Sequence, residues 1–236
     1  GATDSIAMAI KPIILRDKLK KWFYMRVEDK LSKKPLWIHV VTERDGDGYK
    51  TKNKFIITNG VDDKKYRPYD CNRIKNSFVF HGNLNYSPNK NAIFNMSEIL
   101  NRLDSKFPLY IVGRGDRNAY LSLNNVVFVG EVGDIAKEIA KYQYYLILMT
   151  SGTGIKNKLL EAMSCDKTII ANELAINGLS DKELLHDSIF VVDDIADILE
   201  VIENNRQKHA RKYVLKNYSW EKFCNSFYDV YSKDEV

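Results

Sequence analysis

Residues 145–163 read YLILMTSGTGIKNKLLEAM, an apolar run followed by a glycine-rich loop and then by a segment of helical character. Consecutive apolar positions are typical of a strand that helices cover on both faces. Glycines in the loop let the backbone approach a ligand closely, and the first N–H groups of a helix favour an anion. The stretch therefore predicts a strand, an anion-binding turn and a helix, in that order.

The same alternation continues on both sides of this stretch. Five further apolar runs, each followed by a helix-like segment, occur at residues 78–80, 109–112, 126–129, 168–171 and 189–192. With residues 145–149 they make six units, which predict an α/β fold with a doubly wound parallel sheet. From Asp194 onward the chain has the pattern of helices, and Ser219-Trp220-Glu221 is typical of the start of the last one.

These patterns divide the chain into four regions. Residues 1–58 precede the alternation and form the first region. Residues 59–76 begin with an Asn-Gly turn, lack periodicity and are predicted to form a linker. The sheet domain then covers residues 77–218, and residues 219–236 hold the final helix.

The first region begins with a long basic segment. Residues 12–34 have few helix breakers and are predicted to form one helix, and over residues 11–34 the basic residues outnumber the acidic ones by six. Such a helix either lies on an anionic membrane or packs its aromatic side chains on a neighbouring element, and the second interpretation is favoured. Apolar runs at 36–41 and 55–57 predict two strands with a short helical link between them.

The composition excludes several classes of protein. The 236 residues are 44% hydrophobic and 28% charged, which supplies enough apolar surface for a core and excludes disorder as the main state. No stretch approaches the roughly 18 consecutive apolar residues of a spanning helix, and no secretion signal is apparent. The three scattered cysteines indicate a reduced, cytoplasmic protein with no metal site. The net charge of +5 identifies no partner by itself, and no nucleic-acid partner is expected.

The ligand of a doubly wound sheet lies at the carboxyl ends of the strands, where four loops of this chain contain glycine. Tight turns account for some of these glycines, but their clustering at one edge of the sheet indicates a site. Gly113 and Gly115 match only part of the dinucleotide fingerprint, because the third glycine would fall at Asn118. The candidate residues in these loops are Gly82, Asn83, Gly113, Arg114, Gly130, Glu131, Val132, Gly152, Thr153 and Gly154.

The last of these loops continues through Ile155 and Lys156 into a helix. Lys158 and Glu161 are three residues apart and share a helix face, so an ammonium can meet a phosphate while the carboxylate accepts hydrogen bonds from sugar hydroxyls. A surface ion pair is the alternative explanation of this spacing. No Gly-Lys-Ser/Thr follows the glycines, so the loop is not a P-loop and no ATPase is predicted.

Several motifs occur together in a fixed order along the chain. They are NGVD at 59–62, FHGNLNYSPN at 80–89, IVGRG at 111–115, VFVGEV at 127–132, GTGIKNKLLEAM at 152–163 and YSW at 218–220. The set resembles the nucleotide-sugar-binding C-terminal lobe of retaining GT-B glycosyltransferases of family 4. The resemblance extends over residues 38–230 and implies a Rossmann-like lobe that follows a partial N-terminal, acceptor-binding lobe at residues 1–58. It also implies that residues 219–236 return to pack on that first lobe.

The resemblance implies roles for the candidate residues. In this family the glutamate at the position of Glu161 holds the ribose hydroxyls, and the loop at Gly82 and Asn83 approaches the diphosphate. The segments at Gly113 and Arg114, and at Gly130, Glu131 and Val132, lie by the base. The implied donor contacts of the fourth loop are Gly152, Thr153, Gly154, Ile155, Lys156 and Lys158. The catalytic residues stay unknown, with Lys158 and Thr153 as donor-side candidates.

Two departures from the family pattern concern the same loops. Thr153 stands where the family more often has a second glutamate, and Asn83 and Asn89 stand where it often has arginine and lysine. A loop with two lysines moves the phosphate-binding charge to Lys156 or Lys158. The contacts to the donor sugar itself are left open by these departures.

The resemblance implies transfer of a sugar from a nucleoside diphosphate sugar, of UDP or GDP type, to a polysaccharide or lipid-linked acceptor with retention. No cofactor and no metal are expected. We expect a cytoplasmic protein with peripheral contact to the inner face of the membrane. The alternative is a noncatalytic nucleotide-sugar-binding module, or the donor subunit of a split glycosyltransferase. An epimerase on the same fold is disfavoured, because the ordered motifs fit transferases better.

Overall fold

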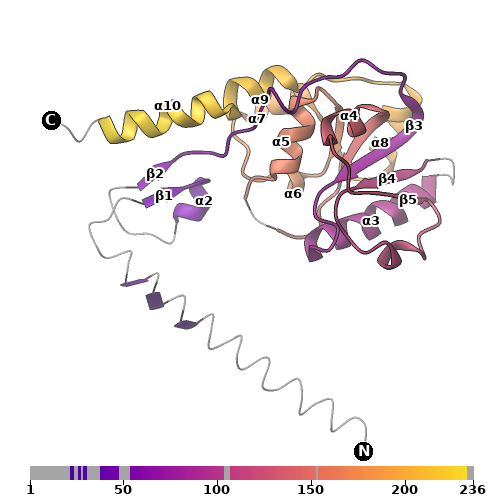
Figure 1. The fold of residues 1–236 in the computed structure, drawn as a ribbon, viewed down its shortest axis with the longest axis horizontal. Coiled ribbons are helices and arrows are strands. Elements are labelled where there is room, and N and C mark those ends of the chain that lie inside the picture. The colour runs from indigo at the N-terminus through magenta and orange to yellow at the C-terminus, as the bar shows by residue number, and fades with distance from the viewer. Residues whose placement is uncertain are drawn as a thin grey trace, which may run out of the picture. The chain divides into compact units, whose positions relative to one another are not determined.

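The computed structural model of the chain describes residues 22–23, 26–27, 29–30, 38–47, 54–103, 107–152 and 154–232. The chain forms two compact units, residues 1–57 and residues 58–236. Figure 1 shows both units and labels most of their helices and the strands β1 to β5.

The first unit holds a small parallel pair of strands. β1 (Ile38–Val40) pairs with β2 (Lys54–Ile56), and the short helix α2 (Glu43–Gly46) lies between them in the chain, as the sequence predicts. His39 Nε2 lies 2.7 Å from the carbonyl oxygen of Ile57 and ties the end of this unit to β1. Of the helix expected at residues 12–34, residues 22–23, 26–27 and 29–30 are helical, and the rest lies outside the described residues.

The second unit is built on a six-stranded parallel sheet with the order β5-β4-β3-β6-β7-β8. The doubly wound α/β fold predicted from the sequence is therefore confirmed. The strands are β3 (Ile74–His81), β4 (Leu109–Val112), β5 (Val126–Gly130), β6 (Tyr142–Ile147), β7 (Thr168–Ala171) and β8 (Phe190–Val191).

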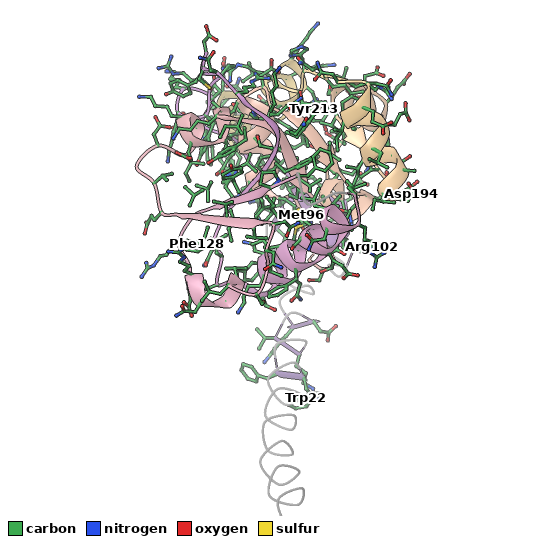
Figure 2. The ribbon with its side chains drawn as sticks, turned by 90° about the vertical axis from the view of Figure 1, so that its right-hand side faces the viewer. Trp22, Met96, Arg102, Phe128, Asp194 and Tyr213 are labelled. Carbon is green, nitrogen blue, oxygen red and sulfur yellow. The ribbon has the colours of Figure 1, made fainter. Side chains whose placement is uncertain are left out.

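Helices cover both faces of this sheet, which explains the consecutive apolar residues of its strands. α3 packs with α8, and α4 packs with α5. Met96 of α3, labelled in Figure 2, is fully buried in the resulting core. The helices are α3 (Ser87–Leu103), the 3-10 turn η1 (Arg117–Tyr120), α4 (Ile135–Ala140), α5 (Asn157–Ser164), α6 (Glu173–Ile176), α7 (Lys182–Ser188), α8 (Ile195–Glu203), α9 (Arg211–Tyr218) and α10 (Trp220–Tyr231).

Side-chain caps explain where several of these helices begin. The side chains of Asp134, Asn172 and Asp194 accept hydrogen bonds from the first turns of α4, α6 and α8. Ser219 caps α10 through a 3.2 Å bond from the N–H of Lys222, which agrees with the start predicted for the last helix. These polar residues satisfy N–H groups that have no partner inside the helix.

The end of β6 and the start of β3 are among the boundaries that differ from the sequence-based expectation. β6 ends at Ile147 instead of continuing to Met149, because Asn172 accepts a hydrogen bond from the Met149 N–H and donates one to its carbonyl oxygen. β3 begins at Ile74, inside the segment 59–76 that was expected to be a linker.

The residues of the second unit that precede β3 pack on its helices. The Val61 N–H donates to the carbonyl oxygen of Tyr218 at 2.7 Å, and the carbonyl oxygen of Tyr66 accepts from Ser164 Oγ at 2.5 Å. Both Val61 and Tyr66 are buried. Their apolar surface holds this segment against α5 and α9, although its polar composition has no regular period.

No helix within the described ranges is long and apolar enough to cross a membrane.

Candidate functional site

The order of the strands creates a switch point at the centre of the sheet. The chain runs from β3 outward through β4 to β5 and then returns to β6 on the other side of β3. Loops that leave the carboxyl ends of such neighbouring strands diverge, and the crevice between them is where open α/β sheets bind ligands. The loop after β3 contains Gly82 and Asn83, and the loop after β6 leads into α5.

Asn89 organises the loop between β3 and α3. This residue is only 2% exposed, and its side-chain amide donates to the carbonyl oxygen of Asn83 at 2.7 Å. The side chain of Asn83 is also engaged, because its oxygen accepts from the N–H of Asn85 at 3.0 Å. The predicted diphosphate loop is therefore held in one conformation by its own asparagines.

Lys158, in the first turn of α5, reaches back to this loop. Its ammonium donates to the side-chain oxygen of Asn89 and lies 5.0 Å from the centre of the Phe80 ring. Burial lowers the pKa of Lys158 to about 8, the positive charge of Lys156 adds to this effect, and the negative charge of Glu161 opposes it. A cation that is partly desolvated in this way gains much from an anionic ligand.

The start of α5 is open to an anion. Within the described part of the chain, the N-cap residue Lys156 makes no side-chain capping bond, and its ammonium donates to the carbonyl oxygen of Gly154 at 2.6 Å. Burial lowers the pKa of Lys156 as well. A cavity of about 520 Å³ lies here, lined by Tyr86, Pro88, Asn89, Met149, Gly152, Ile155, Lys156, Asn157 and Lys158. Thr153 lies outside the described residues.

Glu161 faces a second, smaller cavity. Its carboxylate lies 2.6 Å from Nε2 of His81, the last residue of β3, and its side chain is 24% exposed. The cavity measures about 290 Å³ and is lined by Gly60, Val61, Asp62, Lys65, Tyr66, Asn157, Glu161 and Trp220. Asn157 lines both cavities, so the two lie on adjoining faces of the first turns of α5.

The surroundings of Glu161 keep its carboxylate ionised. Burial by itself raises the pKa of this carboxyl, but hydrogen bonds from His81 and Tyr66 and the positive charge of Lys65 outweigh burial, so the pKa lies below its ordinary value. Burial, and then the nearby carboxylate, raise the pKa of the Tyr66 hydroxyl. Glu161 is therefore an acceptor at neutral pH, with donors already in place on its protein side.

The loops after β3, β4 and β5 pack on one another. The residues in them that were predicted to contact the base do not line either cavity. The Gly113 N–H donates to the carbonyl oxygen of Gly130 at 2.7 Å, and the Leu84 N–H donates to that of Arg114 at 2.8 Å. Arg114 and Glu131 are exposed, and Val132 is half-buried. Among the described residues, these three do not line either of the two cavities. Their role at a base therefore stays a prediction.

The sequence motifs do not predict the residues that contact Glu161 and Lys158 from within the protein. They assign no role to His81, Lys65 or Tyr66, and Asn89 appears only as a departure from the family pattern. His81 alone has a sequence signal, because it is a polar residue at the end of an otherwise apolar strand. In the described part of the chain, no group of three His, Cys, Asp or Glu residues could hold a metal ion.

A parallel sheet of this order, with an open helix start at its switch point, is the architecture of the Rossmann-like lobe of GT-B glycosyltransferases. A model of the family described as "Glycosyl transferases group 1" matches residues 75–205, more than half of the chain. The chain belongs to this family.

Relatives and solved structures agree with this assignment. An uncharacterized glycosyltransferase of Methanocaldococcus jannaschii is 26% identical over 200 residues, which cover 73% of this chain and 48% of the relative. HepE of Anabaena, solved in complex with UDP, has a TM-score of 0.67 at 14% identity, covering 83% of this chain and 63% of HepE. A glycosyltransferase of Rickettsia africae has a TM-score of 0.72 at 14% identity, covering 87% of this chain and 66% of the Rickettsia protein.

The chain thus spans about half the length of the curated relative that it matches. At identities near 14%, the structural likeness shows the fold alone.

Proposed function

We propose that the second unit binds a nucleoside diphosphate sugar and forms the donor side of a glycosyltransferase. The observation that carries this proposal is the arrangement at the start of α5. Lys158 and the open helix start border one cavity, and the ionised carboxylate of Glu161 borders the adjoining one. A nucleoside diphosphate has the matching chemistry, an anion joined to a sugar with vicinal hydroxyls.

The diphosphate occupies the larger cavity in this proposal. The helix start contributes N–H groups and the positive end of the helix dipole, and the lysines contribute formal charge. Lys158 lies beside Gly82. A β-carbon added to Gly82 would lie 3.3 Å from Cε of Lys158. Gly82 leaves room for this lysine, which supports a role for both residues at the phosphates.

Glu161 accepts hydrogen bonds from the ribose hydroxyls in this proposal. An ionised carboxylate only accepts hydrogen bonds, and each of its oxygens has room for two. His81 uses one position on Oε2, so further positions are left for a ligand. The base then lies toward the loops at Gly113, Arg114, Gly130, Glu131 and Val132, as the family resemblance implies.

The retaining mechanism, the acceptor and the membrane contact are proposed from the resemblance of the sequence motifs to the family. We propose that the enzyme belongs to the retaining family 4 and transfers a sugar to a glycan or lipid-linked acceptor in the cytoplasm, with peripheral contact to the membrane. The departing diphosphate gains negative charge, and helix N–H groups with two lysines can stabilise it without a metal ion. The sugar-side contacts involve Thr153 and Lys158 in this proposal.

Binding of nucleotides to the chain tests the proposal without an acceptor. We expect UDP to bind with a dissociation constant in the millimolar range or tighter in calorimetry, with the same affinity in EDTA. GDP and ADP identify the base preference, and uridine measures the contribution of the diphosphate. The proposal is wrong if none of the three diphosphates binds, and the metal-free part is wrong if EDTA abolishes binding.

A further inference from the structure

Two buried polar side chains, those of His81 and Tyr145, are linked to the Glu161 carboxylate. His81 is 1% exposed, and both of its ring nitrogens are engaged. Nε2 lies 2.6 Å from Oε2 of Glu161, and Nδ1 lies 3.0 Å from the hydroxyl of Tyr145 on β6. The rings of His81 and Tyr145 meet edge to face, with centres 5.5 Å apart.

We infer that His81 is a positioning residue for the nucleotide, which holds the Glu161 carboxylate toward the ribose, while Tyr145 holds the histidine ring in place through Nδ1. This inference rests on the proposed function of Glu161. It concerns two residues, on β3 and β6, that border the switch point of the sheet.

The contact with Glu161 defines which ring nitrogen of His81 donates to it. A carboxylate can only accept, so the proton at this contact belongs to His81 Nε2. Nδ1 is engaged by the Tyr145 hydroxyl, which can donate or accept. Tyr145 is fully buried, and burial raises its pKa well above the ordinary value, so its proton is retained. His81 thus donates to Glu161 and is itself held by Tyr145.

This arrangement has a consequence for the ligand. A carboxylate that accepts from His81 is fixed in rotation and keeps its remaining acceptor positions for a ligand. The His81 hydrogen bond is the largest of the contributions that keep this carboxyl ionised against burial, and a protonated carboxyl has one acceptor position fewer. His81 therefore acts on the ribose through Glu161, without touching the nucleotide.

A surface pair in the same unit offers a matched control. His209 Nδ1 lies 2.8 Å from the carboxylate of Asp166, but the His209 side chain is 73% exposed. Neither residue lines the two cavities at α5 among the residues described there. Replacing His209 removes the same type of interaction without affecting Glu161.

The test compares the binding of UDP and 2′-deoxy-UDP to the full chain. His81→Met removes the donor at similar volume, and we expect UDP affinity to fall about tenfold while 2′-deoxy-UDP changes much less. His81→Gln places an amide N–H near the position of Nε2 and should restore most of the preference for the ribose hydroxyl. His209→Met should change neither affinity.

Nitrogen-15 NMR of the unaltered chain reports directly whether His81 Nε2 carries a proton. We expect a proton on Nε2 both in the unaltered chain and after Tyr145→Phe, because the contact with Glu161 remains. Tyr145→Phe should also lower, in part, the preference for UDP over 2′-deoxy-UDP. This second variant keeps the test valid if His81→Met fails to fold.

Two results would overturn the inference while leaving the proposed function intact. One is an unchanged preference for UDP over 2′-deoxy-UDP in His81→Met, and the other is a His81 ring with no proton on Nε2. Failure of the unaltered chain to bind any nucleoside diphosphate would contradict the proposed function itself, and the inference with it.

Discussion

A β-carbon on Gly113 would lie 2.0 Å from the carbonyl oxygen of Gly82. Gly113 follows β4 with a backbone φ of 131°, and Gly82 follows the neighbouring strand β3. The Gly82 N–H also donates to the carbonyl oxygen of Val112 at 3.0 Å. The loops after β3 and β4 are therefore in backbone contact, and only glycine fits at position 113.

Gly113→Ala should lower the free energy of unfolding by about 2 to 4 kcal/mol, because a side chain combines an unfavourable φ with a clash against backbone. The UDP affinity of the folded fraction should fall as well, since the loop at Gly82 must shift. Urea unfolding measures the first effect. Gly133→Ala is the matched control, because no described atom lies within 4 Å of its added β-carbon. Equal stability of the two variants would contradict this prediction.

Glu161→Ala should weaken UDP binding by about 1 to 3 kcal/mol, through the loss of charge-assisted hydrogen bonds to the ribose. Calorimetry with UDP and 2′-deoxy-UDP separates this role from a general disturbance, because the variant should lose its preference for the ribose hydroxyl. Glu200→Ala, at an exposed position on α8, should bind as the unaltered chain does. If Glu161→Ala retains the full preference, the ribose contact belongs to another residue.

Lys158→Ala should weaken UDP strongly and leave uridine nearly unchanged, because only the diphosphate carries the charge that this lysine offsets. Lys156→Ala should do less, since its ammonium already donates to the carbonyl oxygen of Gly154. Titration of both ligands into both variants measures the difference. Equal losses for UDP and uridine would indicate a disturbed loop, and a larger effect at Lys156 would exchange the two roles.

UDP affinity should fall as the pH rises above about 8. Burial lowers the pKa of Lys158 to about 8 in the free chain, so the ammonium that binds the diphosphate is lost above this pH. A bound diphosphate raises that pKa, and binding then takes up a proton, with a decline of up to about tenfold per pH unit. Below pH 7 the lysine is charged and contributes no slope.

Lys158→Arg keeps its charge throughout this range and should remove the decline. Isothermal titration between pH 7.5 and 9.5 checks this, because a phosphate with a second pKa of about 6 is fully ionised there. A decline of the same size in Lys158→Arg would assign the titration to another group.

Lys167 should make stability depend on pH. Its ammonium is buried and donates to the carbonyl oxygen of Tyr142, and burial, with the charge of Arg73, lowers its pKa to about 7. The unfolded chain, with a pKa of about 10.4, binds more protons between these values, so stability should rise with pH in this window. Below about pH 7 the lysine is charged in both states, and the cost of burying its charge lowers the stability by its full amount.

Lys167→Met removes the titrating group and should reduce this slope by up to about 1.4 kcal/mol per pH unit between pH 7.5 and 9.5. Urea unfolding at several pH values measures the slope, and Lys216→Met, at an exposed position on α9, is the control. An unchanged slope in Lys167→Met would show that the lysine stays charged in the folded chain.

The strands and the positions of the loops could be predicted from local pattern. β4 and β7 agree with the apolar runs at 109–112 and 168–171 residue for residue, because strands buried on both faces need apolar residues at consecutive positions. The glycine-rich loops follow from the same alternation, since a loop must end each strand at the same edge of a parallel sheet. The resemblance of these loops to the family also depends on short motifs of consecutive residues.

The strand order and the contacts of the site required the tertiary structure. The apolar runs are similar in any order, and only packing decides that β6 returns beside β3. Glu161 and Lys158 meet His81 and Asn89, which lie 80 and 69 residues earlier in the chain. Hydrogen bonds depend on separations of tenths of an ångström, which local sequence does not determine. Local sequence thus determined which residues form the edge of the sheet, whereas the fold determined which of them hold Glu161 and Lys158 in place.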